Sequence, residues 1–145
     1  MSENLISNGE FDNGNSQWGF TSNGSGVATE NETVTVINNY CRITSTEAIY
    51  QQINLEPGKK YLIKIYSRSP FLTGTLSVMT ENTNDVWGVP VIINKNRSNT
   101  WHEEQFIVEA QASWVSPLMI HIRAEQNPEP SFYLDVDKID LTETI

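Results

Sequence analysis

The chain has little cysteine and few basic residues. Its single cysteine, Cys41, cannot form an intramolecular disulfide, so the fold does not depend on a disulfide framework. Nine Lys and Arg residues stand against 18 Asp and Glu residues, and the formal net charge is -9 at pH 7. No block of basic residues occurs, and the apolar runs fall far short of the roughly 20 residues that cross a bilayer. We therefore expect no nucleic-acid partner and no membrane insertion.

Motifs of catalysis are also absent. His102 and His121 have no metal-ligand spacing with each other or with Cys41. The sequence contains neither a Gly-x-Ser-x-Gly elbow nor a glycine-rich phosphate loop. The adjacent acids Glu103 and Glu104 would point to opposite faces of a strand, which is typical of solvated surface rather than of an acid–base pair. We therefore expect that the protein is not an enzyme.

The 145 residues suffice for one domain with a proper hydrophobic core, and the 38% of hydrophobic residues argues against disorder. We expect residues 4–143 to form this single domain and residues 1–3 to be a linker remnant or an added start. The N-terminus lacks a charged region followed by an apolar one, so we expect no signal peptide. These features indicate a monomeric module of a longer, secreted bacterial protein.

Short segments of alternating polarity, separated by turn residues, predict strands nearly throughout. A strong turn signal at 56–59 precedes one of them, and Pro90 places another at a sheet edge. No stretch has sustained helical spacing. The pattern predicts an all-β, antiparallel two-sheet sandwich. The expected strands are 33–37, 49–55, 61–68, 75–78, 89–93, 106–108, 118–123 and a last strand around Leu134.

The alternation also predicts which side chains point inward. In 61–68 the odd positions are expected in the core, which leaves Tyr66 and Arg68 on the opposite face. In 118–123 the even positions are core, so His121 and Arg123 point away. The expected core comprises Phe11, Trp18, Ile63, Ile65, Leu76, Val78, Phe106, Ile120, Ile122 and Leu134.

Four segments resemble the β-sandwich carbohydrate-binding modules of families four, nine and twenty-two. They are the opening Asn-Leu-Ile-Ser-Asn-Gly-Glu-Phe-Asp at 4–12 with Gly14 and Trp18, the 50–61 segment, Trp101 with 106–108, and Leu-Asp-Val-Asp-Lys-Ile-Asp-Leu at 134–141. The resemblance implies a jelly roll like the galactose-binding domains. It also implies non-catalytic attachment of a larger protein to polysaccharide or glycan.

The resemblance further implies a structural calcium ion (Ca²⁺) that ties the N-terminal segment to the last strand. The implied ligands are Glu10, Asp12 and Asp137. Calcium takes six to eight oxygen ligands, and clustered carboxylates repel one another unless they are neutralised. Asp135 is an alternative to Asp137, because the spacing from Val136 to Ile139 needs a bulge.

Sugar recognition needs aromatic faces and paired polar groups. We expect two central strands to bring Tyr66, Arg68 and Arg123 together across one sheet, while Gln51 or Gln52 supplies an amide. Trp18 and Trp101 match framework positions and are expected in the core. The predicted ligand-binding residues are Tyr40, Gln52, Tyr66, Arg68, Trp87, Trp114, His121 and Arg123.

A second hypothesis stays open. The same scaffold serves structural or protein-interaction domains of toxins and cell-surface proteins that bind no sugar. Fold alone does not decide between the two hypotheses, because function depends on the site that a fold carries.

Overall fold

The structure is a computed structural model in which every described element of regular structure is a strand. It describes residues 3–13, 16–21, 35–37, 40–45, 47–80, 86–114, 117–129 and 131–144. For residues 21, 35–37, 80 and 86–89 only the backbone is described. Across these ranges the chain contains no helix that is long and apolar enough to span a membrane.

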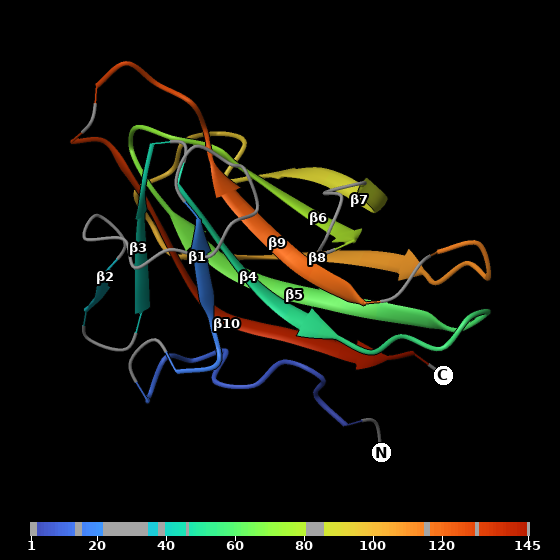
Figure 1. Ribbon diagram of the computed structural model, residues 1–145. Coiled ribbons are helices and arrows are strands. Elements are labelled where there is room, and N and C mark those ends of the chain that lie inside the picture. The colour runs from blue at the N-terminus through green and yellow to red at the C-terminus, as the bar shows by residue number, and fades with distance from the viewer. Residues whose placement is uncertain are drawn as a thin grey trace.

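Within the described residues, ten strands form two five-stranded antiparallel sheets that pack face to face (Figure 1). In one sheet, here called the β10 sheet, the strand order is β2 (Thr35–Ile37), β3 (Tyr40–Thr44), β10 (Tyr133–Glu143), β5 (Lys60–Arg68) and β8 (His102–Glu109). In the other, the β9 sheet, it is β1 (Gly19–Thr21), β4 (Ala48–Ile53), β9 (Leu118–Ala124), β6 (Gly74–Thr80) and β7 (Val86–Ile93). The predicted all-β sandwich is confirmed.

The core lies between the two sheets and is built by the predicted alternation. In β5 the odd positions Tyr61, Ile63 and Ile65 are at most 2% exposed, whereas the even positions from 62 to 68 are half-buried on the outer face. Nine of the ten predicted core side chains are buried. The exception is Phe106, which is half-buried and packs against the core from β8, a strand at the sheet edge.

Two strands were not predicted, and both are short. β1 has three residues, too few for an alternation to be recognised. β3 has five residues, and Arg42 in its middle gives it a polar appearance. The prediction that the segment with Pro90 is an edge strand is confirmed, because β7 ends the β9 sheet.

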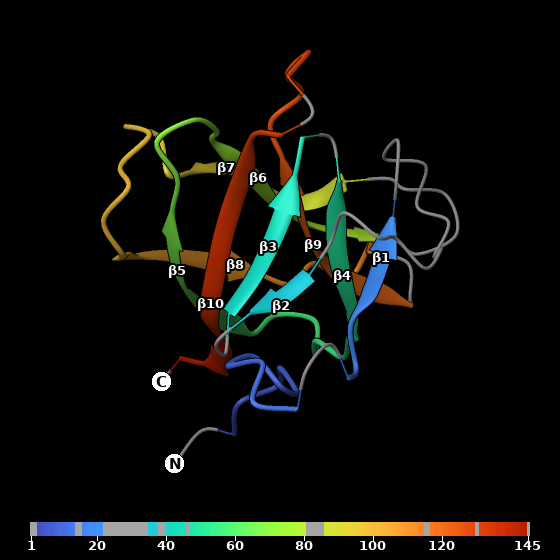
Figure 2. The same ribbon diagram turned by 90° about the vertical axis from the view of Figure 1, so that its left-hand side faces the viewer.

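The N-terminal segment docks onto the last strand of the fold (Figure 2). Leu5 N donates to Leu141 O at 2.7 Å, and Ile139 N donates to Gly9 O at 3.1 Å. Gly9 lies so close to β10 that a Cβ atom there would be 2.1 Å from Ile139 O. This docking brings the acids of the 8–13 turn to the strand that carries Asp137.

Candidate functional site

The predicted ligand-binding residues lie on two different faces. Tyr40, Tyr66 and Arg68 are on the outer face of the β10 sheet, on β3 and β5. Gln52, His121 and Arg123 are on β4 and β9, in the other sheet. The expectation that Tyr66, Arg68 and Arg123 meet across one sheet is therefore wrong. Alternation fixes the side of a strand that a residue occupies, but it does not fix the sheet to which the strand belongs.

Of the two tryptophans predicted in the core, only one is buried there. Trp18 is buried, as expected, but Trp101 is not a core residue: it is half-buried and contacts Arg68 on the outer face of the β10 sheet. Trp114 follows β8 and packs against the core while half-buried. Trp87 belongs to β7, and its side chain lies outside the described residues.

The outer face of the β9 sheet has three rows of paired residues across β4, β9 and β6. The middle row is Tyr50, His121 and Ser77. Gln52, Met119 and Met79 form the row on one side, and Ala48, Arg123 and Thr75 form the row on the other. These nine residues are called the His121 face.

His121 is buried at the centre of this face, with 3% of its surface exposed. Its Nε2 atom has no hydrogen-bond partner among the described residues. Within the described part of the chain, no other buried side-chain nitrogen or oxygen lacks one. Burial lowers the pKa of His121 to about 4, and the positive charge of Arg123 adds to the effect. The imidazole is therefore neutral at pH 7.

Two further residues of the His121 face differ from what the sequence indicated. Tyr50 was not predicted as a site residue, although it shares its face with Gln52. Its ring lies against β1, because a Cβ on Gly19 would be 2.4 Å from Tyr50 Cζ. Gln52 is exposed, whereas the amide of Gln51 is bound to the N-terminal backbone: it accepts from Ser7 N at 2.7 Å and donates to Ser7 O at 2.9 Å. Of the two glutamines, Gln52 is thus the one available to a ligand.

The outer face of the β10 sheet has a row of alternating aromatic and guanidinium groups. The guanidinium of Arg42 lies 3.7 Å from the ring centroid of Tyr133 and 6.0 Å from that of Tyr40. That of Arg68 lies 5.1 Å from the ring centroid of Tyr40 and 4.6 Å from that of Trp101. This row, Tyr133–Arg42–Tyr40–Arg68–Trp101, is called the arginine–aromatic ladder.

Asp135 holds the ladder together from β10. Its side chain is 1% exposed and accepts from Arg42 Nε at 2.9 Å, from Arg42 Nη2 at 3.2 Å and from Arg68 Nε at 3.1 Å. A buried carboxylate needs such partners, because an unpaired charge is very unfavourable there. Asp135 is therefore occupied by ion pairs, so that Asp137 is the better candidate of the two aspartates predicted as calcium ligands.

Asp137 lies in an acidic environment. Its pKa is raised to about 6, first by burial and then by the charges of Glu10 and Asp12, against the opposing hydrogen bond from Lys138 N. The residue pairing between β10 and β5 shifts register between Asp137 and Asp140. This shift is the bulge that the spacing from Val136 to Ile139 needs. Within the described ranges, no group of three or more His, Cys, Asp or Glu side chains is close enough to hold a metal ion by itself.

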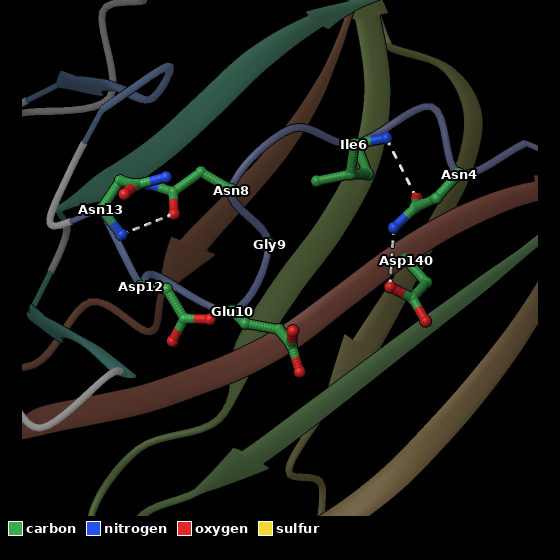
Figure 3. A pocket seen from close by; sticks show the side chains of 8 residues that line it. All are labelled: Asn4, Ile6, Asn8, Gly9, Glu10, Asp12, Asn13 and Asp140. Atoms are coloured by element: carbon green, nitrogen blue, oxygen red, sulfur yellow. Dashed lines mark hydrogen bonds between the residues drawn. The ribbon is translucent and has the colours of Figure 1, made fainter.

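A small polar pocket of about 230 Å³ opens beside this turn (Figure 3). Asn4 closes one side: its Nδ2 donates to Asp140 Oδ1 at 2.9 Å. The carboxylates of Glu10 and Asp12 both extend toward β10, on the same side of the turn (Figure 3). The lining residues are Asn4, Ile6, Asn8, Gly9, Glu10, Asp12, Asn13 and Asp140.

Comparison with known proteins gives a likeness of fold. No family model matches the chain, and no curated protein matches it. A family 4 carbohydrate-binding module superimposes with a TM-score of 0.70 at 16% identity, over 96% of this chain and 99% of that one. A family 61 module in complex with β-1,4-galactotriose has a TM-score of 0.59 at 15% identity, over 97% and 98%.

The same fold also occurs in an enzyme. The Stig cyclase Fisc from Fischerella sp. TAU has a TM-score of 0.70 at 12% identity, over 99% of this chain and 98% of that one. At these identities the likeness concerns the fold alone. The predicted resemblance is confirmed at that level: the chain has the β-sandwich fold of the carbohydrate-binding modules.

Proposed function

We propose that this domain binds carbohydrate without catalysis, and that the His121 face is its binding surface. The observation that carries the proposal is the unpartnered Nε2 of His121, buried in the middle of a face with polar and aromatic neighbours. An unsatisfied buried polar atom costs about 1–3 kcal/mol, so its presence in a folded protein calls for an explanation. A ligand hydroxyl that donates to or accepts from this nitrogen would remove the cost, once the groups that bury His121 have moved aside.

The neighbours of His121 suit a sugar. The ring of Tyr50 offers an apolar face for the C–H groups of a pyranose. Gln52 is exposed and supplies a donor and an acceptor in one planar group. Hydroxyl groups both donate and accept, which matches this mixture better than a purely apolar or purely charged ligand would. Trp87 stays a predicted contact from β7, and Trp114 a predicted contact from the loop before β9.

The absence of a recognisable catalytic group on this face supports a binding role over an enzymatic one. His121 has no carboxylate partner on its register neighbours, which are Tyr50 and Ser77. General acid–base catalysis by histidine needs a pKa near the working pH, whereas burial lowers the pKa of His121 to about 4.

We further propose the structural calcium ion, with Asp12, Asp137 and Glu10 as its carboxylate ligands. The raised pKa of Asp137 supports this proposal, since a divalent cation would relieve the repulsion among these groups. Three carboxylates are not sufficient for calcium by themselves, so backbone carbonyls of the turn and water would complete the site. Attachment of a larger secreted protein to its substrate would then be the role of the domain.

The binding proposal is tested by isothermal titration with soluble β-linked oligosaccharides, including β-1,4-galactotriose. Truncation of Tyr50 to Ala should weaken binding by about 1–3 kcal/mol through loss of the stacking surface. Gln52→Ala should weaken it by about 1 kcal/mol through loss of hydrogen bonds to hydroxyls.

Gln105→Ala is the matched control, because Gln105 is an exposed glutamine on the outer face of the opposite sheet. Its affinity should equal that of the wild type. Unchanged affinity in the Tyr50 and Gln52 variants would remove the site from the His121 face. No binding across a broad glycan array would instead favour a structural or protein-interaction domain.

A further inference from the structure

The arginine–aromatic ladder has donors that Asp135 does not use. Asp135 binds Nε and Nη2 of Arg42 but only Nε of Arg68. Within the described residues, both terminal nitrogens of Arg68 and Nη1 of Arg42 make no hydrogen bond. The two terminal nitrogens of one guanidinium form a fork that matches the two oxygens of a carboxylate.

These donors are accessible from solvent. The side chains of Arg42 and Arg68 are 30% and 27% exposed, although the carboxylate between them is buried. Both guanidinium groups are fixed by ion pairs and by aromatic neighbours, so little side-chain entropy would be lost when a ligand binds. The ladder is thus a preorganised group of donors on an open sheet face.

The ladder is also locally positive in a strongly acidic protein. Two guanidinium groups stand against one carboxylate, which leaves one excess positive charge, while the whole chain carries -9. Elsewhere on this face Tyr66 is accompanied by Lys138, whose Nζ lies 5.1 Å from the ring centroid. Apart from Asp135, which pairs with Arg68, the acids in register here are Asp137 and Glu103, which both pair with Tyr66. Glu103 accepts a hydrogen bond from Gln105.

Aromatic surface lies directly beside the unused donors. The rings of Tyr40 and Trp101 are half-buried, with centroids 5.5 Å apart and planes inclined at 73°. A carboxylate on Arg68 would place an attached pyranose ring next to these two rings. The combination of a guanidinium fork with an aromatic neighbour fits an acidic sugar better than a simple anion.

We propose that the ladder is a second ligand site, which binds the carboxylate of an acidic sugar at the end of a glycan. The choice of a sugar as the carrier of the carboxylate rests on the proposed carbohydrate-binding function, whereas the carboxylate site itself does not. The net charge of the chain opposes polymers with a charge on every residue, so a single terminal acid is the expected ligand.

The test compares cellobiouronic acid, in which glucuronic acid caps glucose, with cellobiose, its neutral counterpart. Titrations use the same buffer and ionic strength, and acetate serves as the bare-carboxylate control. We expect the acidic disaccharide to bind at least about tenfold more tightly than cellobiose, with an affinity that falls as salt is added. Acetate should bind more weakly than the disaccharide, since it has no ring to contact Tyr40 and Trp101. Polygalacturonate, which carries a charge on every residue, is titrated as well. Per uronate, it should bind no more tightly than the acidic disaccharide.

Two variants assign the binding to the ladder. Arg68→Lys keeps the positive charge beside Asp135 but removes the fork of two terminal nitrogens. It should lower the affinity for the acidic disaccharide about fivefold or more. Trp101→Leu leaves every ion pair of Asp135 in place and should also weaken it. Thermal melts establish whether each variant is folded. If Arg68→Lys does not fold, Trp101→Leu still tests the proposal.

The same experiments separate this site from the His121 face. Gln52→Ala should leave the affinity for cellobiouronic acid unchanged, and Arg68→Lys should leave any neutral-sugar affinity unchanged. Equal affinity for cellobiouronic acid and cellobiose would overturn the ladder proposal, as would chemical-shift changes on β4 and β9 instead of β3 and β5. Acetate binding as tight as that of the disaccharide would show a carboxylate site with no sugar recognition, which also contradicts the proposal.

Discussion

At the scale of the residue, His121 makes the stability of the domain depend on acidic pH. Its pKa falls from 6.5 in the unfolded chain to about 4 in the folded one. Below pH 6.5 the unfolded chain therefore binds a proton that the folded chain does not, and stability is lost as the pH falls toward 4. We expect a loss on the order of 3 kcal/mol over this range, measured by urea denaturation at a series of pH values.

His121→Gln is the control for this prediction, because glutamine keeps a polar group but does not titrate. The difference in the free energy of unfolding between wild type and variant should shrink as the pH falls from 6.5 to 4. Asp137 titrates in the opposite sense, since its raised pKa removes stability as the pH rises from about 4 to about 6. The comparison at each pH cancels that contribution. A pH-independent difference would mean that His121 does not titrate as proposed.

Asp135 illustrates what a single residue in a sequence does not reveal. It stands two positions from Asp137, and both were candidates for a calcium ligand. The structure pairs it with Arg42 and Arg68, which are 93 and 67 positions away. Such partners are set by strand order, and strand order is not contained in the local pattern of residues. The side of β5 on which Arg68 lies was, by contrast, predicted from alternation.

At the scale of the element, the N-terminal turn depends on its contact with β10. Gly9→Ala would place a Cβ 2.1 Å from Ile139 O, a distance that requires the turn to move away from the strand. The hydrogen bond from Ile139 N to Gly9 O would then be lost. We expect the free energy of unfolding to fall by about 2–4 kcal/mol, measured by urea denaturation.

Gly58→Ala provides the comparison. Gly58 has a φ of +87° in the turn before β5, but a Cβ there would meet no atom within 4 Å. Only the backbone conformation is strained, so the loss should be about 1 kcal/mol. If both variants lose the same stability, the close contact of Gly9 with β10 is not what holds the turn.

Whole elements were more predictable than their arrangement. The segments at 61–68 and 118–123 appear as β5 and β9 with the expected core positions. Period-two alternation reports burial on one side of a strand, and both strands have such a side. Both also lie inside their sheets, but in different sheets, so their outer faces are on opposite surfaces of the domain. For that reason one predicted site became two candidate faces.

At the scale of the whole molecule, the two faces differ in how their polar groups are satisfied. Asp135 balances one of the two positive charges of the arginine–aromatic ladder, whereas the His121 face contains a buried nitrogen without a partner among the described residues. The sandwich separates the faces by a full hydrophobic core, so a substitution on one should not alter binding on the other. Distant sites without shared partners are usually additive. Because the faces are independent, an experiment can contradict the neutral-sugar proposal without contradicting the acidic-sugar proposal, and the reverse.

Calcium provides the prediction for the molecule as a whole. The proposed ligands Asp12 and Asp137 lie on the N-terminal turn and on the last strand, so an ion between them would hold together two segments that are remote in sequence. If calcium binds only the folded state, it should raise the free energy of unfolding by about 3 kcal/mol at a hundredfold excess over its dissociation constant. Calorimetric melts with calcium and with a chelator measure this difference.

Asp137→Asn should abolish the calcium effect. It should also stabilise the chelated domain at pH 7, because the variant removes a carboxylate whose ionisation is opposed by burial and by Glu10 and Asp12. Glu109→Gln, at the exposed end of β8, should preserve the calcium effect. Identical melts with calcium and chelator in the wild type would show that these acids hold no calcium.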